Sequence, residues 1–164
     1  MDDDHVALIC EALLEHDVEF VVIGGVAARL HGTGHATVDI DVCPAIGDSN
    51  LERLASALVE LNARLRVEGE PNGIPFDPHP DSLGRAATMT LITDHGPLDL
   101  CFAPAGIGDG YSELVAGASS VPLATVLVPV ASLADVVRSK RSAGRAKDIV
   151  ALPALERRLR ELEG

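Results

Sequence analysis

Two aspartates in a short apolar segment are the strongest candidates for chemistry in this sequence. Asp39 and Asp41 stand two residues apart in the run 38–43, whose β-branched residues predict a strand closed by Pro44. Alternation along a strand places both carboxylates on one face, roughly 6 to 7 Å apart. Two unpaired carboxylates on one face repel each other, and a divalent cation between them removes the repulsion. Mg²⁺ suits such oxygen ligands, so the pair predicts a metal site.

Two adjacent glycines precede these aspartates. Gly24 and Gly25 lie between an apolar run at 20–23, which predicts a buried strand, and a helix expected over 26–30. Glycines at such a turn let a phosphate approach the backbone, and the helix start presents free N–H groups. Gly-Gly alone is typical of a tight turn, and Asp-x-Asp alone of a solvated strand edge. Together in one β-α-β unit they indicate phosphoryl or nucleotidyl transfer.

Asp99 is the candidate for a third carboxylate. It lies in the apolar run 98–102, which predicts a strand, and a lone Asp in a buried strand is costly unless it is paired, hydrogen-bonded or metal-bound. A surface-facing residue on an edge strand is the alternative, and we favour a metal-binding or general-base role. Alternation places Cys43 on the face of Asp41 and Cys101 on the face of Asp99. Small apolar filler is the favoured interpretation of both thiols.

The remaining patterns predict how the chain is organised. Residues 69–84 and the Gly-rich residues 103–110 predict loops, and Pro153 is expected to break or kink the last helix. The order of elements predicts an α/β (α+β) fold, with a mixed β-sheet flanked by helices and a short C-terminal helical extension. We expect a core at 1–130 and helices at 131–164 packed on it, in a single domain. The other expected elements are helices at 4–15, 50–63, 132–142 and 146–162, strands at 88–93 and 98–102 joined by a turn at 94–96, and an extended stretch at 121–130.

Charge is distributed unevenly along the chain. The net charge is −12, yet residues 138–164 hold eight Lys and Arg against four Asp and Glu. The acidic remainder argues against non-specific nucleic-acid binding by the whole surface, while the basic segment can receive a polyanion on one side. A solvated helix of mixed charge is the favoured interpretation from composition alone.

Several features bear on location. No apolar run approaches the roughly 20 residues that span a bilayer, and the acidic start is unlike a secretory signal. Three cysteines fit neither an even disulfide framework nor a CxxC metal pattern. We therefore expect a cytoplasmic protein with no membrane partner.

At these motifs the sequence resembles the DNA polymerase β-like nucleotidyltransferase superfamily, and more narrowly its AbiEii/MenT-type toxin branch. The shared pattern is a hydrophobic strand, Gly-Gly, a short helix and then Thr-Val-Asp-Ile-Asp at 37–41. A third Asp on a later strand matches Asp99. The toxin branch also has a downstream Lys followed by an Asp, which resemble Lys140 and Asp148. The resemblance extends over residues 20–150.

This resemblance implies roles for individual residues. Asp39 and Asp41 would bind two Mg²⁺ ions, and Asp99 would share one of them and activate the attacking hydroxyl. Lys140 would neutralise the triphosphate, and Asp148 would orient Lys140 or the base. The nucleotide-binding residues would be Gly24, Gly25, Thr37, Lys140 and Arg145, with Lys147 also able to contact a nucleotide or an RNA acceptor.

Two departures from the family pattern concern the triphosphate. His35 stands where many relatives carry an Arg, and a neutral His is a weaker partner for an anion. Gly25 stands where many relatives carry a Ser, which removes a hydroxyl donor. Neither change affects the expected metal ligands.

The leading hypothesis is therefore an enzyme that moves a nucleoside monophosphate from an NTP to an acceptor hydroxyl. The acceptor would be the tRNA 3′ end or a protein side chain, and the enzyme would be the toxin of a toxin–antitoxin pair. One alternative is a nucleotide- or partner-binding domain without turnover, which would bind NTP without Mg²⁺. The other is a small-molecule, antibiotic-type nucleotidyltransferase, ranked lower because a small, aromatic-poor chain offers little pocket surface.

Overall fold

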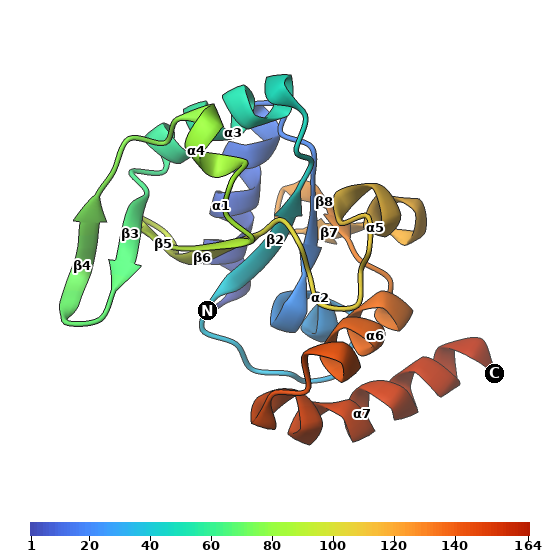
Figure 1. The fold of residues 1–164 in the computed structure, drawn as a ribbon. Helices are drawn as coiled ribbons and strands as arrows, with labels where there is room; N and C mark the ends of the chain where they lie inside the picture. Colours follow the sequence, from blue (N-terminus) through green and yellow to red (C-terminus); the bar gives the residue numbers. More distant parts are fainter.

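A single eight-stranded mixed sheet forms the centre of the protein, in a computed structural model that describes residues 1–164 (Figure 1). The strands follow the order β4-β3-β5-β6-β2-β1-β8-β7. Only the β1–β8 and β2–β6 pairs are parallel, and the other pairs are antiparallel. The strands are β1 (Phe20–Ile23), β2 (Ile40–Pro44), β3 (Arg64–Val67), β4 (Glu70–Pro75), β5 (Thr88–Thr93), β6 (Gly96–Cys101), β7 (Ser119–Leu123) and β8 (Val126–Val130).

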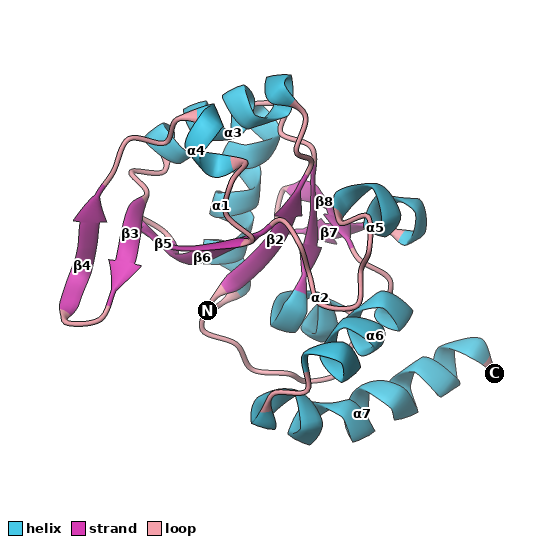
Figure 2. Cartoon of the chain, in the orientation of Figure 1, coloured by secondary structure: helices cyan, strands magenta, loops and turns pink.

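Seven helices surround this sheet (Figure 2). The helices α1 and α3 are in contact with each other and cover one face of the sheet. The helix α2 packs against α6, and α6 packs against α7. The C-terminal half of α7 extends away from the body of the molecule (Figure 1). The helices are α1 (Asp3–Glu15), α2 (Gly24–Leu30), α3 (Asp48–Glu60), α4 (Pro80–Leu83), α5 (Tyr111–Gly117), α6 (Leu133–Ala143) and α7 (Ala146–Glu163).

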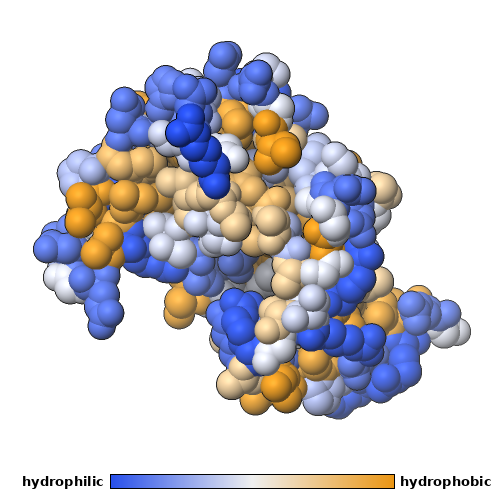
Figure 3. Space-filling model, in the orientation of Figure 1, coloured by the Kyte–Doolittle hydropathy of each residue, from blue (hydrophilic) through white to orange (hydrophobic).

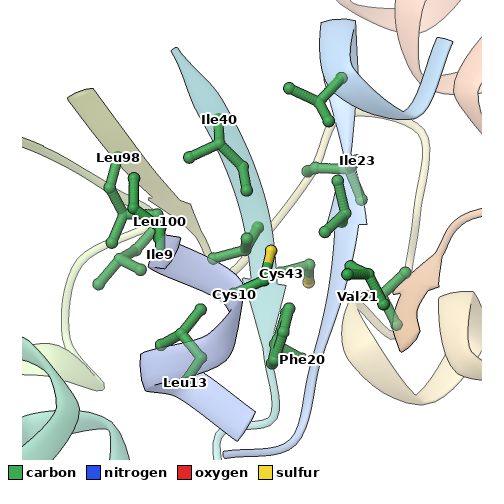
Figure 4. Close-up of a cluster of buried hydrophobic side chains, with 14 of the residues drawn as sticks. Ile9, Cys10, Leu13, Phe20, Val21, Ile23, Ile40, Cys43, Leu98 and Leu100 are labelled. Atoms are coloured by element: carbon green, nitrogen blue, oxygen red, sulfur yellow. The ribbon is translucent and has the colours of Figure 1, made fainter. Parts of the chain in front are cut away.

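The core lies mainly between α1 and the central strands. Ile9 and Leu13 of α1 pack with the side chains of Ile40, Leu98 and Leu100, all of which are fully buried (Figure 4). These three residues alternate along β2 and β6 with the aspartates, so one face of the central strands is apolar and the other carries carboxylates. Burial of the apolar face therefore determines where Asp41 and Asp99 point.

The predicted fold class is confirmed: a mixed sheet with flanking helices and two C-terminal helices. The strands expected over 20–23 and 88–93 lie where the apolar runs place them. No helix in the structure has the length and hydropathy needed to cross a membrane.

The predicted long loop at residues 69–84 is wrong, because it contains β4 and α4, and β3 before it was not predicted. β4 is an exposed edge strand that includes Pro71 and Pro75, so it has no apolar alternation to detect. Gly73 has a positive φ of 68°, and a Cβ at this position would lie 2.6 Å from Ile92 Cγ2. The helix α5 was not predicted either.

Several details of the other elements also differ from the expectation. Asp39 lies outside β2, which begins at Ile40. The extended stretch at 121–130 is a hairpin of β7 and β8. α7 continues through Pro153. Pro153 and Ile149, whose carbonyl has no helical donor because proline lacks an N–H, are both exposed residues.

Candidate functional site

Two of the three candidate carboxylates face each other across the central strands. Asp41 on β2 and Asp99 on β6 are partners in the parallel ladder, and Thr90 on β5 is the partner of Asp99 on the other side. All three side chains line the same cavity. Residues far apart in sequence therefore form one polar row on the face of the sheet opposite the core.

The Asp41 carboxyl is held in an unfavourable electrostatic environment. Burial, followed by the charges of Asp39 and Asp99, raises its pKa to about 6, and no hydrogen bond offsets these effects. The pKa of Asp99 is also raised by burial, although the Arg66 guanidinium opposes that shift. Such an excess of buried negative charge indicates a place for a cation.

Asp39 is oriented by its neighbours rather than by the sheet. The Thr37 hydroxyl donates to Asp39 Oδ1 at 2.9 Å and lies 3.0 Å from the Asp39 carbonyl oxygen. Arg66 Nη1 lies 3.9 Å from Asp39 Oδ2. Thr37, expected to bind nucleotide, does not line the cavity and instead positions an aspartate that was expected to bind metal.

The glycine pair is packed against these same residues. A Cβ on Gly24 would lie 2.3 Å from Asp41 Oδ2, and Gly24 has a positive φ of 65°. A Cβ on Gly25 would lie 2.9 Å from Thr37 Cβ and 3.1 Å from His35 Cδ2. There is no room for a serine at position 25, because Thr37 and His35 occupy the space that its side chain would need.

A basic cluster with a buried acid at its centre faces the carboxylates. Lys140 Nζ on α6 donates to Asp148 Oδ1 at 3.1 Å, and Arg145 Nε donates to Asp148 Oδ2 at 2.6 Å. Asp148 is fully buried, and Lys140 is 8% exposed. Burial alone would raise the pKa of Asp148, yet the hydrogen bonds from Arg145 and Lys140 lower it below its ordinary value.

His35 lies close enough to this cluster to respond to its charge. Burial, followed by the charges of Lys140 and Lys147, lowers the pKa of His35. The imidazole is therefore neutral at pH 7 while nothing anionic is bound beside it.

A cavity of about 440 Å³ brings the two ends of the site together. Gly24, Asp41, Asp99, Lys140 and Arg145 all line it, whereas Asp39 and Gly25 do not. Its remaining lining includes the hydroxyl-bearing residues Thr88, Thr90 and Ser139 and the apolar side chains of the 103–107 loop, α5 and α6.

Arg66 is the main residue that the sequence pattern did not reveal. Its Nη2 donates to Asp99 Oδ1 at 3.0 Å and to Oδ2 at 3.3 Å. No motif marks it, because it is an arginine in the short, polar strand β3, which was itself not predicted. Only the pairing of β3 with β5 brings it towards Asp99.

The three carboxylates match the oxygen ligands that Mg²⁺ prefers, so the donor chemistry fits a divalent cation. In their present positions, however, no three His, Cys, Asp or Glu side chains lie close enough together to hold a metal ion. Arg66 bridges Asp39 and Asp99 at this point. Arg66 therefore lies next to the position that a metal shared by the two aspartates would take.

Several solved structures have a fold similar to that of this chain. No protein-family model matches the sequence, and no curated protein matches it. The solution structure of the antibiotic-resistance factor ANT(2'')-Ia superposes with a TM-score of 0.60 at 16% identity, covering 93% of this chain and 81% of that one. The lincomycin-bound crystal structure of the lincosamide antibiotic adenylyltransferase LnuA superposes with a TM-score of 0.60 at 14% identity, covering 95% and 97%.

A third similar structure is a Thermotoga maritima protein, TM1012, described as a nucleotidyltransferase. It superposes with a TM-score of 0.56 at 16% identity over 90% of this chain and 88% of that one. The chain has the nucleotidyltransferase fold. At such low identity the likeness establishes the fold alone, and the AbiEii/MenT branch is not among these three structures.

Proposed function

We propose that the protein is a Mg²⁺-dependent nucleotidyltransferase that moves a nucleoside monophosphate from an NTP to an acceptor hydroxyl. The observation that carries this proposal is the cavity in which Asp41 and Asp99 face Lys140 and Arg145. Acidic groups at one end suit a metal ion and a hydroxyl, and cations at the other end suit a triphosphate. The nucleotidyltransferase fold of the similar structures supports the same chemistry.

The residues divide the work of the reaction between them. The acceptor oxygen bonds to the α-phosphorus while the bond to the pyrophosphate oxygen breaks, and Asp99 takes the acceptor proton. Burial raises the pKa of Asp99, which makes it a better base than an ordinary surface carboxylate. Arg145 and Lys140, both held by Asp148, neutralise the triphosphate and the pyrophosphate that leaves.

Asp39, Asp41 and Asp99 would hold two Mg²⁺ ions, which stabilise the charge that develops on the phosphoryl oxygens. Thr37 orients Asp39 through its hydroxyl. Gly24 keeps the backbone clear of the Asp41 carboxylate, so that a phosphate can approach at that turn. Gly25 leaves room for the side chains of Thr37 and His35.

For the acceptor we infer the 3′ end of tRNA or a protein side chain, with the protein acting as the toxin of a toxin–antitoxin pair in the cytoplasm. This inference depends on the motif resemblance to the AbiEii/MenT branch. The exposed basic side chains at the start of α7, Arg145 and Lys147, offer phosphate contacts for an RNA end. The C-terminal end of α7 is mainly hydrophilic on the face that Figure 3 shows.

A small-molecule acceptor is the second candidate. A small chain is no obstacle to such an activity, since this chain spans 97% of the length of LnuA, a lincosamide antibiotic adenylyltransferase. Part of the cavity is apolar, with Pro104, Ile107, Leu114 and Val136 in its wall, and could receive the body of a hydroxylated small molecule.

The test supplies Mg²⁺ and each of the four NTPs, labelled at the α-phosphate, with total RNA, a protein extract or a panel of antibiotics as acceptor. The wild type is expected to label one acceptor class, and Asp41→Asn is expected to lose the labelling. Asp81→Asn, which changes an exposed aspartate outside the cavity, is the matched control.

The identity of the labelled product decides between the acceptors. Label in RNA supports the toxin hypothesis, and label in an antibiotic supports the second candidate. Absence of label in every class, with the wild type equal to Asp41→Asn, would falsify the enzyme hypothesis. In that case Mg²⁺-independent NTP binding that survives Asp39→Ala would identify a binding domain without turnover.

A further inference from the structure

Arg66 occupies a position between two carboxylates that the proposed reaction needs. Its guanidinium contacts Asp99 with one nitrogen at 3.0 Å and Asp39 with the other at 3.9 Å. The Arg66 side chain is 36% exposed, against 13% for Asp99 and 21% for Asp39. An arginine that reaches in from solvent therefore neutralises two largely buried acids.

The register of the sheet places Arg66 on the same face as Asp99. The β3–β5 register pairs Leu65 with Leu91, so one step further along the ladder Arg66 lies beside Thr90, which is the partner of Asp99. Asp41, Asp99, Thr90 and Arg66 thus form one row across four strands on the same face. This row is a consequence of strand order and does not appear in the sequence.

The ladder between β3 and β4 is irregular at Arg66 itself. Leu65 pairs with Ile74 and Val67 pairs with Glu70, so that Arg66 alone faces the three residues between Glu70 and Ile74. Irregularities of this kind occur at sheet edges and next to active sites, where they redirect a side chain. Arg66 therefore has no regular partner on β4.

A groove in the same hairpin is lined by Arg66 and by a carboxylate without a partner. A groove of about 370 Å³ is lined by Arg66, Gly69, Glu70 and Pro71 and extends to Ile92. Glu70 is an exposed carboxylate in that groove, and it makes no ion pair.

We propose that Arg66 and a divalent cation compete for Asp39 and Asp99, so that metal binding moves Arg66 off these carboxylates and towards Glu70. A guanidinium and a metal ion cannot both occupy the space between the two acids, since both need the same carboxylate oxygens. Arg66 thereby lowers the affinity of the site for the free ion. The inference rests on the proposed function only for the role of the metal ion in catalysis, and the competition itself concerns metal binding alone.

The experiment measures Mn²⁺ binding without nucleotide, by calorimetry and by the electron paramagnetic resonance signal of the free ion. Arg66→Met is expected to bind Mn²⁺ roughly tenfold more tightly than the wild type, the equivalent of one charge-assisted hydrogen bond. Arg64→Met is the matched control, because Arg64 lies on the same strand but contacts Asp94 and the Asn72 carbonyl instead. Its Mn²⁺ affinity is expected to equal that of the wild type.

A second variant tests the alternative position without altering Arg66. Glu70→Gln is expected to weaken Mn²⁺ binding roughly twofold, as an exposed ion pair predicts, and to have no effect in the Arg66→Met background. Equal Mn²⁺ affinities of Arg66→Met, Arg64→Met and the wild type, or no binding by any of them, would overturn the proposal. Failure of the proposed function is a separate outcome: Arg66→Met gains Mn²⁺ affinity, but no acceptor is labelled.

Discussion

The cavity has a carboxylate end, formed by Asp41 and Asp99, and a basic end, formed by Lys140 and Arg145. The buried acids at these two ends differ in whether other groups compensate their charge. At the carboxylate end, Asp41 has no hydrogen bond and its pKa is raised to about 6 by burial and by two like charges. At the basic end, Asp148 is more deeply buried but receives hydrogen bonds from Lys140 and Arg145, and its pKa is lowered. Asp41 therefore has no partner within the protein, whereas Asp148 has two.

This difference separates two roles that a sequence motif cannot distinguish. A buried acid with its charge fully compensated stabilises the fold and positions its partners, as Asp148 does for Lys140. An acid without compensation costs stability, and a protein retains it where a ligand supplies the missing charge. Mutations at the two ends should therefore have opposite effects on stability.

The largest expected effect is on activity at the carboxylate end. Asp41→Asn should reduce nucleotidyl transfer roughly 10³-fold, because a lost metal ligand removes several kcal/mol of transition-state stabilisation. In EDTA the free energy of unfolding of the same variant should be about 1–3 kcal/mol higher than that of the wild type. The reason is that the substitution removes a buried negative charge, and the raised pKa of Asp41 shows that this charge is unfavourable in the folded protein. Label transfer and urea denaturation measure the two effects, and a loss of stability would contradict the comparison.

At the basic end, the expected effect is on stability. Asp148→Asn should lower the free energy of unfolding by about 3–5 kcal/mol, because it leaves the buried Lys140 ammonium without its counter-ion. Urea denaturation at neutral pH measures this. Glu156→Gln is the control, since it removes the partner of the exposed Arg141 and should cost less than about 1 kcal/mol. Equal losses in the two variants would show that burial does not distinguish these pairs.

A substitution at the glycine turn should perturb the carboxylate end from the backbone side. Gly24→Ala combines a positive φ with a methyl group placed 2.3 Å from Asp41 Oδ2, and should destabilise the fold by about 2–4 kcal/mol. Gly34→Ala has a similar φ of 63° and open space around the new methyl, so it should cost only about 1 kcal/mol. The difference between their unfolding free energies isolates the collision with Asp41, and no difference would show that Asp41 moves freely.

The smallest expected effect is the pH dependence of the basic end. The folded-state pKa of Asp148 is lowered below 3.8, so its contribution to stability is fully present above that pH and is lost as pH falls through the folded pKa. The difference in unfolding free energy between the wild type and Asp148→Asn should therefore stay constant from neutral pH to about 4 and shrink below it. A difference that shrinks as pH rises would have the wrong sign for this account.

Much of the fold was predictable because its signals are local. The apolar runs at β1 and β5, the helical spacing in α1 and α3, and the glycine turn are each visible within a few residues of sequence. The hairpin of β3 and β4 was not predictable in this way, because β3 has only four residues and β4 is exposed and contains two prolines. An exposed edge strand has no buried face to impose alternation.

The candidate site also has a part that local sequence signals predict and a part that they do not. The sequence by itself determined that Gly24, Asp39, Asp41 and Asp99 lie at the ends or centres of apolar strands, where unpaired carboxylates and bare backbone are costly without a ligand. Only the tertiary structure decided that Asp41 faces Asp99, that Asp148 is buried between Lys140 and Arg145, and that Arg66 reaches Asp39 and Asp99. The contacts of Asp99 with Asp41 and with Arg66 depend on the β2–β6 and β3–β5 pairs, which join strands that are not consecutive in the chain, whereas the contacts of Asp148 depend on the packing of α7 against α6. Pairing across such a sheet is governed by long-range packing, which no local pattern records.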